Sequence, residues 1–446
     1  MTLPGGIIGD AYRFESWTLL ESLTELDHRM AGSEGEQAAI AMVTEAFADV
    51  GVRDVSTESF SFPGWERGRS ELIAGQSYAH PHECIALPGT PAGEVSAPLV
   101  DVGYGLPEAF AETDVAGAIV LASSDTPPDA DRWMHRREKY RLAVDAGAAG
   151  FLFRNHVPGC LPPTGDVGTE DGSGEIPALG VSREVGARLA RQCEREQQAQ
   201  SETGQQSQSE NGKEATLTIE CTNEPMDSAN VSGVIGPKQT DEELLVTAHH
   251  DAHDIAEGAR DNGSGTAILV EIARLLAPVA SELDVPVRFV TFGAEEVGLR
   301  GSQAYAELHE TDTIRAVVNC DAIGSTRDLG VYTHGFDGLD EPFVRAGEEL
   351  GVPVTIRDEL APHSDHWPLV KQGVPGVMAY SVEESDDRGW GHTHGDTLDK
   401  VDRRDLRELA VVLTAAVYDL ATGESPTAHV DPETIEQWAR EEGHIE

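Results

Sequence analysis

Histidines and acidic residues in the second half of the chain form short clusters, three of which directly follow apolar runs typical of buried strands. These clusters are His249-His250-Asp251, Glu295-Glu296, Asp321 and, near the end, His392-Thr393-His394-Gly395-Asp396. Open α/β sheets place their functional sites at the carboxyl ends of their strands. Imidazoles and carboxylates together form a ligand set that suits divalent zinc. The pattern therefore predicts a metal centre at one edge of a sheet.

The number of carboxylates exceeds what one metal ion needs, which points to a site with two metal ions. In two-metal sites the ions lie about 3.5 to 4 Å apart, and one carboxylate can bridge them. Asp261 is the predicted bridge, because the glycine-rich segment Gly258–Gly265 brings its carboxylate close to a turn that leads into a helix. Glu295 and Glu296 are neighbours leaving a strand and point in different directions, so one can ligate while the other faces a bound water.

Strands and helices alternate in this half of the chain. The predicted strands are 244–248, 287–292, 316–318 and 374–380, and the predicted helices are 266–276, 302–309, 343–350 and 404–420. Continuous apolar strands that alternate with helices predict an α/β sheet covered on both faces.

The first half of the chain has a different pattern of apolar and polar residues. Amphipathic patterns predict two helices within residues 13–50, and the alternation over 55–62 predicts a strand. Short apolar runs between glycines and prolines over about 80–190 predict a small β-rich module with a helix at 140–146. The segment 194–215 is rich in Gln, Ser and Glu and predicts a flexible surface loop.

Length and composition limit the class of protein. A chain of 446 residues suits two or three domains. A net charge of −47 argues against a nucleic-acid partner, because a polyanion would be repelled. We see neither a secretory signal nor a run of about 18 apolar residues, and the five cysteines are sparse. We therefore expect a cytoplasmic protein that does not bind membranes; the sequence leaves the oligomeric state open.

The acidic residues are scattered along the chain, which indicates a salt-adapted surface. Charge repulsion of this size should destabilise the compact state in dilute buffer, whereas molar salt screens charges beyond about 3 Å. Circular dichroism and activity are therefore expected to improve from dilute buffer to molar KCl. Identical behaviour in both buffers would contradict this prediction.

The clusters and their surroundings resemble the di-zinc exopeptidases of clan MH, metallopeptidase family twenty-eight, which includes aminopeptidases, glutamate carboxypeptidase and the catalytically dead transferrin receptor. The segments that carry the resemblance are Ala248–Asp251, Gly258–Gly265, Phe292–Ser302, Asn319–Gly324 and His392–Thr397, in this order. Arg29–Gly35 resembles the opening segment of the family, and residues 80–195 resemble an inserted protease-associated domain.

The resemblance implies a fold and a set of roles. The fold would be α/β, a doubly wound mixed sheet of the phosphorylase/hydrolase-like zinc exopeptidase type, with residues 1–79 and 216–446 in the peptidase domain, 80–195 in the β-rich insert and 196–215 in the loop. Two Zn²⁺ ions, or other divalent metals, would act on peptide substrates. The implied metal ligands and base are His249 and Asp321 for one ion, Glu296 and His392 for the other, Asp261 as the bridge, and Glu295 as the general base.

We expect supporting roles for further residues near these motifs. Asp251 is expected to orient His249 by accepting its second ring N–H, although a turn cap fits the sequence equally well. Asp396 could hold the tautomer of His392 or stabilise a loop turn. His253 we interpret as a surface or supporting residue, not as a ligand. Asp365 and His366 belong to a segment that resembles one near the family's substrate pocket, where binding and packing are equally compatible with the sequence.

One departure concerns the closing histidine. Many members carry a tyrosine just before it, which helps to hold the tetrahedral intermediate, whereas this chain has Gly391. Tyr380 and Trp390 are candidate pocket residues, but the sequence identifies no substitute donor.

An aminopeptidase is the favoured function. The alternatives are a carboxypeptidase or dipeptidase of the same family, a non-catalytic receptor-like member, and a cyclising enzyme built on one zinc. The full set of ligands disfavours the last two.

Overall fold

The computed structural model describes residues 9–130, 132–170, 172–203, 214–238, 240–382, 390–423 and 427–445. The chain forms two compact units. Unit 1 consists of Met1–Phe62, Asp227–Gly391 and Asp396–Glu446, and unit 2 of Pro63–Met226 with the short stretch His392–Gly395.

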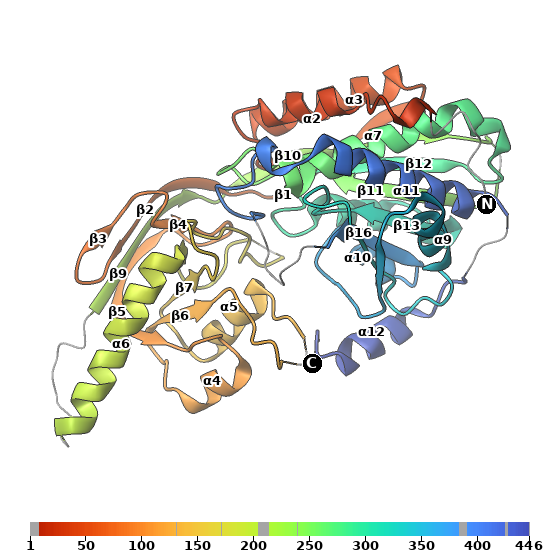
Figure 1. The fold of residues 1–446 in the computed structure, drawn as a ribbon. Helices are drawn as coiled ribbons and strands as arrows, with labels where there is room; N and C mark the ends of the chain where they lie inside the picture. Colours follow the sequence, from red (N-terminus) through yellow and green to blue (C-terminus); the bar gives the residue numbers. More distant parts are fainter. Residues whose placement is uncertain are drawn as a thin grey trace. The chain divides into compact units, whose positions relative to one another are not determined.

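Unit 1 is built on a mixed sheet of eight strands within the described residues (Figure 1). Their order across the sheet is β1 (Arg53–Pro63), β10 (Pro225–Ile235), β12 (Val287–Phe292), β11 (Glu243–His249), β13 (Ile314–Cys320), β16 (Gly376–Ser381), β14 (Leu329–Tyr332) and β15 (Val354–Arg357). The four central strands β12, β11, β13 and β16 run parallel, whereas β10 and β14 join them antiparallel.

Helices cover both faces of this sheet. Successive side chains of its strands point to opposite sides, so neighbouring residues pack against different helices. Val246 on β11 packs into the larger core cluster, with α7 (Ser264–Leu276) and α11 (Arg403–Ala421), whereas its neighbour Leu245 packs into a second cluster. That second cluster includes Tyr305 of α8 (Arg300–Leu308) and Leu369 of α10 (Trp367–Val370). The predicted doubly wound α/β fold is confirmed.

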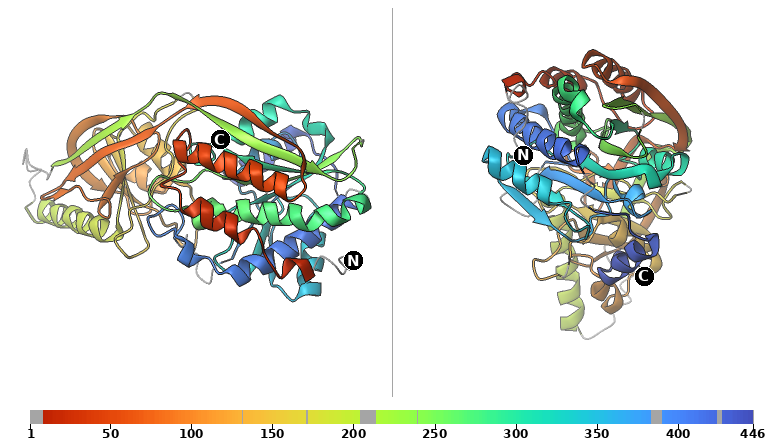
Figure 2. Two further views of the ribbon diagram at one scale, coloured as in Figure 1. Left: turned by 90° about the horizontal axis from the view of Figure 1, so that it is seen from above. Right: turned by 90° about the vertical axis from the view of Figure 1, so that its right-hand side faces the viewer.

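The remaining helices of unit 1 are α2 (Trp17–Thr24), α3 (Glu34–Asp49), α9 (Glu341–Leu350) and α12 (Pro432–Glu441). Helices α2, α3 and α7 contact one another and lie side by side in Figure 2. The segment Ala259–Glu282, which contains α7, is long and apolar enough to cross a membrane, and the sequence reading overlooked it. However, 78% of its most apolar window is buried inside the protein, as expected of a core helix.

Unit 2 contains a second eight-stranded sheet among its described residues. The order is β3 (Ser77–Tyr78), β2 (Glu66–Ile73), β9 (Glu214–Thr222), β5 (Gly93–Asp101), β6 (Ile119–Ser123), β7 (Gly150–Arg154), β8 (Ala178–Val181) and β4 (Cys84–Ala86). Helices α4 (Pro107–Glu112), α5 (Arg136–Asp145) and α6 (Arg183–Thr203) accompany it. Phe151 on β7 packs edge-on against Tyr140 of α5 in the core of this unit. The predicted β-rich module is confirmed.

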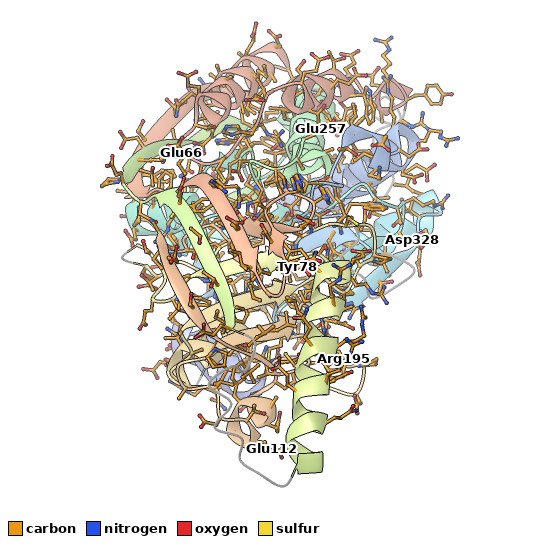
Figure 3. The ribbon with its side chains drawn as sticks, turned by 90° about the vertical axis from the view of Figure 1, so that its left-hand side faces the viewer. Glu66, Tyr78, Glu112, Arg195, Glu257 and Asp328 are labelled. Carbon is orange, nitrogen blue, oxygen red and sulfur yellow. The ribbon has the colours of Figure 1, made fainter. Side chains whose placement is uncertain are left out.

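Two boundaries differ from the sequence prediction. Strands β2, β3 and β9 belong to unit 2, so this unit is larger than the predicted 80–195. The predicted loop is in part helical, because α6 continues through Thr203; Arg195 lies on this helix in Figure 3. Glutamine and glutamate are good helix formers, which explains how a segment with little to bury can extend a helix. Residues 204–213 of the predicted loop lie outside the described residues, and its last two residues, Glu214 and Ala215, belong to β9.

Candidate metal centre

Three neighbouring strands deliver the acidic and histidine clusters to one edge of the unit 1 sheet. His249 ends β11 and is paired in register with Phe292, the last residue of β12. Asp321 directly follows β13, which also runs parallel to β11. Because the carboxyl ends of adjacent parallel strands meet, His249, Asp321 and the Glu295-Glu296 pair come from distant parts of the sequence to the same edge.

A first group of side chains surrounds the ring of His249. Its Nε2 atom lies 3.3 Å from Asp261 Oδ1, 3.4 Å from Asp321 Oδ1 and 4.0 Å from Glu295 Oε2. Ligand atoms of His249, Glu295 and Asp321 all lie within 4.8 Å of one another. A single imidazole nitrogen thus faces three carboxylates at distances compatible with a shared cation.

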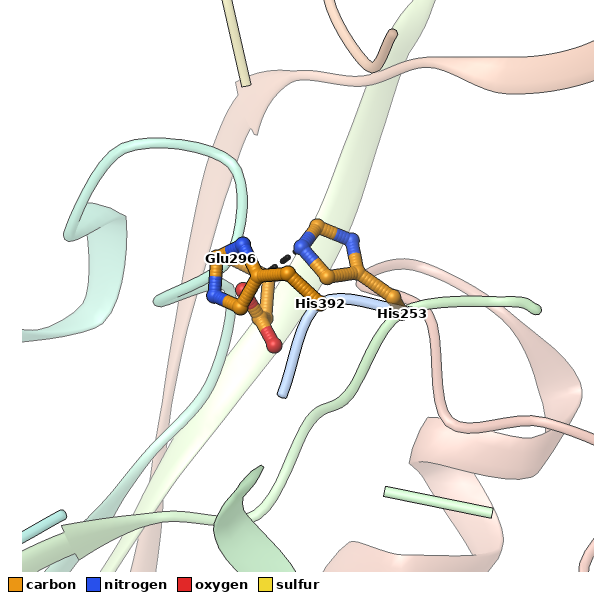
Figure 4. A group of neighbouring side chains, drawn as sticks. All are labelled: His253, Glu296 and His392. Atoms are coloured by element: carbon orange, nitrogen blue, oxygen red, sulfur yellow. Dashed lines mark ion pairs between the residues drawn. The ribbon is translucent and has the colours of Figure 1, made fainter. Parts of the chain in front are cut away.

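A second group consists of His253, Glu296 and His392, whose ligand atoms also lie within 4.8 Å of one another (Figure 4). The Nε2 atom of His253 lies 2.9 Å from Glu296 Oε2. His392 belongs to the short stretch His392–Gly395, which unit 1 residues flank on both sides along the chain. The sequence reading did not count His253 among the ligands, and the structure brings it into this group.

A tight turn positions Asp261. Gly258 adopts a left-handed conformation with φ of 59° at the start of this turn. A Cβ atom on Gly265 would come within 2.6 Å of the carbonyl oxygen of Cys320, so glycine permits the turn to approach the end of β13. The side chain of Asn262 secures the same approach by donating to that carbonyl at 2.8 Å.

Asp396 also holds this turn. Its two oxygens accept the backbone N–H groups of Arg260 at 2.8 Å and Asp261 at 3.0 Å. Both oxygens thus fix the backbone around the predicted bridge, a contact of the kind expected of the turn-stabilising alternative for Asp396. Burial and the nearby charge of Asp261 raise the pKa of Asp396 to about 6.

Asp251 contacts both His249 and the acid pair. Its Oδ1 atom lies 3.3 Å from His249 Nδ1, the contact expected of a residue that orients this ring. The same carboxylate accepts the backbone N–H groups of Glu295 at 3.1 Å and Glu296 at 3.2 Å, a role that the sequence did not indicate. Although burial opposes it, the contact with His249 keeps the pKa of Asp251 below its usual value.

A chain of buried hydrogen bonds fixes Asp321. Thr247 Oγ1 donates to Asn319 Oδ1 at 2.7 Å, Asn319 Nδ2 donates to Ser364 Oγ at 2.7 Å, and Ser364 Oγ donates to Asp321 Oδ2 at 2.5 Å. This arrangement leaves Oδ1 of Asp321 directed at His249. Ser364 therefore has a positioning role that the sequence reading missed.

The two residues that follow Ser364, Asp365 and His366, are both fully buried. Burial raises the pKa of Asp365 to about 7, against the lowering effect of His249. The ring of His366 donates a hydrogen bond from Nε2 to the carbonyl of Ala361 at 3.0 Å, and it lies tilted against the ring of His334 with 4.5 Å between the ring centroids. Burial keeps the pKa of His366 well below its usual value.

Glu36 on α3 supports the turn that carries the acid pair. Its buried carboxylate accepts the N–H of Gly32 at 2.6 Å, the hydroxyl of Ser228 at 2.7 Å and the N–H of Ala294 at 3.2 Å. Ala294 itself adopts a positive φ of 55°. The resemblance of Arg29–Gly35 to a family segment directed attention to this region, yet gave no reason to single out Glu36.

The electrostatics of the centre favour a bound cation. Burial raises the pKa values of Glu295 and Glu296 well above their usual range, and neighbouring carboxylates add to the effect. Burial opposes protonation of His249, but the surrounding carboxylates, Glu295 first, raise its pKa well above the usual value. The buried guanidinium of Arg29 donates its hydrogen bonds to backbone carbonyls, among them those of His250 and Gly258. The mixed nitrogen and oxygen donors fit a divalent ion such as zinc.

The two candidate pocket residues, Tyr380 and Trp390, have other contacts. Tyr380 lies on β16 and stacks on Tyr332 with 5.1 Å between ring centroids. Trp390 is partly exposed, and its ring lies 5.2 Å from Lys400 Nζ. These contacts give no ground to assign either residue as the substitute for the tyrosine expected at position 391.

A doubly wound α/β sheet with imidazoles and carboxylates gathered at its carboxyl edge is an arrangement that suits a metal-dependent hydrolase. The model of peptidase family M28 matches residues 230–417, and the PA domain model matches residues 95–189. Residues 230–417 therefore form a peptidase family M28 domain and residues 95–189 a PA domain, and the chain is a peptidase.

Relatives match over most of their length. The chain is 28% identical to "Aminopeptidase YwaD" of Bacillus subtilis (strain 168), over 95% of this chain and 87% of the relative. It is 24% identical to "Carboxypeptidase Q" of Bos taurus, over 88% of this chain and 82% of the relative. Among solved structures, a zinc aminopeptidase from Bacillus subtilis is similar with a TM-score of 0.67 and 26% identity, covering 93% of this chain and 97% of that one.

Proposed function

We propose that the protein is a zinc-dependent aminopeptidase that hydrolyses peptides at a two-metal centre. The observation that carries this proposal is the convergence of two ligand groups, one around His249 and one around Glu296, at a single edge of the sheet. The similarity to a zinc aminopeptidase supports the choice of metal and of reaction.

Five side chains would hold the two ions. His249 and Asp321 would bind one, Glu296 and His392 the other, and Asp261 would bridge them. Asp261 contacts His249, and Asp396 accepts a hydrogen bond from the backbone N–H of Asp261. Both contacts support a fixed bridging position for Asp261. When bound, paired zinc ions polarise a carbonyl group and lower the pKa of water.

Glu295 would serve as the general base. Its side chain is about 10% exposed, whereas that of Glu296 is about 2% exposed, so Glu295 is the member of the pair that can reach a water molecule. Its raised pKa suits a carboxylate that must accept a proton. Glu295 would take a proton from the attacking water and then deliver it to the leaving amine.

Similarity to aminopeptidases, both a sequence relative and a solved structure, favours an aminopeptidase over a carboxypeptidase. The similarity to carboxypeptidase Q supports the competing proposal, in which the protein is a carboxypeptidase.

A pair of blocked dipeptides distinguishes an aminopeptidase from a carboxypeptidase. Dipeptides with a free amine are expected to be hydrolysed in high salt, and acetylation of the amine is expected to abolish turnover. Amidation of the carboxyl terminus serves as the matched control and should leave turnover intact. Hydrolysis of the acetylated peptide together with loss of activity on the amidated one would show a carboxypeptidase instead.

A further inference from the structure

His253 is a buried histidine within reach of the metal centre that has no role in the reaction as described so far. It lies in the loop after β11, four residues beyond His249 in the sequence, and its side chain is only about 4% exposed. Its Nε2 atom lies 2.9 Å from Glu296 Oε2, and Glu296 has a side-chain exposure of about 2%. Figure 4 shows the rings of His253 and His392 both beside the Glu296 carboxylate.

We propose that His253 is a direct ligand of the ion that Glu296 and His392 hold, which gives this ion two imidazoles and one carboxylate in addition to the bridge. The inference rests on the proposed two-metal centre and extends its ligand set. Two histidines with one glutamate are a protein ligand set that catalytic zinc uses elsewhere.

The positions of the donor atoms support this ligand set. Two donors of one tetrahedral zinc, each about 2.1 Å from it, lie about 3.4 Å apart. The separation of 2.9 Å between His253 and Glu296 is close to this value, and ligand atoms of all three side chains lie within 4.8 Å of one another. A small adjustment of side chains therefore suffices to place them around one ion.

The charge of the centre gives a physical reason for a further imidazole. Asp261, Asp321, Glu295 and Glu296 already supply carboxylates, and a further acid would add repulsion in a buried site. A neutral imidazole adds a ligand without adding negative charge. We expect the ion at Glu296 to be the more tightly held of the two.

An alternative contact must be separated from ligation. His253 could donate a hydrogen bond to Glu296 from outside the ligand shell, which would orient this carboxylate without touching the ion. Both arrangements place the two side chains together, so the experiment must report on the atoms bound to the metal.

X-ray absorption of the zinc-loaded wild-type protein counts the imidazoles directly. Ligation by His253 predicts three imidazoles for two ions, from His249, His253 and His392. Two imidazoles for two ions would overturn the inference about His253 while leaving the proposed function intact. A protein that binds no zinc at all would overturn the proposed metal centre itself.

Cobalt binding to a His253→Cys variant provides the second test. A thiolate that touches cobalt gives a strong near-ultraviolet charge-transfer band, so we expect this band in the variant and not in the wild-type protein. His309→Cys is the matched control, because His309 Nε2 makes the same 2.9 Å contact with a glutamate, Glu58, and neither residue belongs to the two ligand groups. A variant that binds the wild-type amount of cobalt without the band would contradict ligation.

Loss of ion affinity completes the experiment. His253→Ala is expected to weaken one of the two zinc sites by about 100-fold or more in a chelator competition, since even supporting residues of a metal site contribute about 10- to 100-fold. The other site should keep its affinity. Zinc affinity at the wild-type level at both sites of this variant would overturn the inference. A count of only two imidazoles in the zinc-loaded wild-type protein would also overturn it.

Discussion

Glu295→Gln is expected to lower kcat by about 10²- to 10⁴-fold, the usual contribution of a positioned general base. Glutamine keeps the size of the side chain but cannot accept the proton of the attacking water. The backbone of this residue is held by Asp251 and does not depend on the substituted group. Zinc content, measured by mass spectrometry on the same sample, should therefore equal that of the wild-type protein.

Glu296→Gln is the matched control for this experiment, because it makes the same substitution at the adjacent position. As a proposed ligand, Glu296 should lose zinc when it is changed, and activity should return in part at high zinc concentration. If Glu295→Gln instead lost zinc and Glu296→Gln kept it, the roles of the two acids would be exchanged. A fully active Glu295→Gln protein with normal zinc would refute the role of base altogether.

Removal of the metal is expected to have the second large effect. A chelator should abolish hydrolysis, and added zinc should restore it, because the proposed reaction needs the ions to polarise the carbonyl group. Stability should fall as well, since the ions bind the folded chain: an ion at 100 times its Kd contributes about 2.7 kcal/mol. The buried carboxylates around His249 would then face one another without a cation.

Activity and thermal unfolding of the same chelator-treated samples check both parts of this prediction. Chelator already saturated with zinc is the control for effects of the chelator on the chain. Unchanged hydrolysis after the zinc has been shown to be removed would contradict a metal-dependent reaction.

The fold of unit 1 could be predicted because its strands are buried on both faces. Such strands are mostly apolar, as in Leu244–Ala248, and they alternate with helices such as α7, whose residues are nearly all buried. The clusters at the carboxyl ends of these strands then followed from topology alone. The end of α6 was harder, because its last residues bury little and their polar composition is compatible with both a helix and a loop.

Residues that act through tertiary contacts escaped the sequence reading. Ser364 reaches Asp321 across 43 positions of the chain, and Glu36 reaches Ala294 across 258. No local spacing encodes such contacts. His253 was visible as a histidine near a ligand, but only the fold brings its ring to Glu296. The contacts of Asp396 with the backbone N–H groups of Arg260 and Asp261 could not be predicted either, because the sequence does not distinguish one backbone group from another.

The zinc content of the purified, zinc-loaded and desalted protein tests the central claim most directly. Mass spectrometry of metal and protein in the same sample is expected to give two zinc ions per chain, as the two groups around His249 and Glu296 require. A value of one or below, from protein that is folded by circular dichroism in high salt, would contradict the two-metal centre on which the proposed reaction depends.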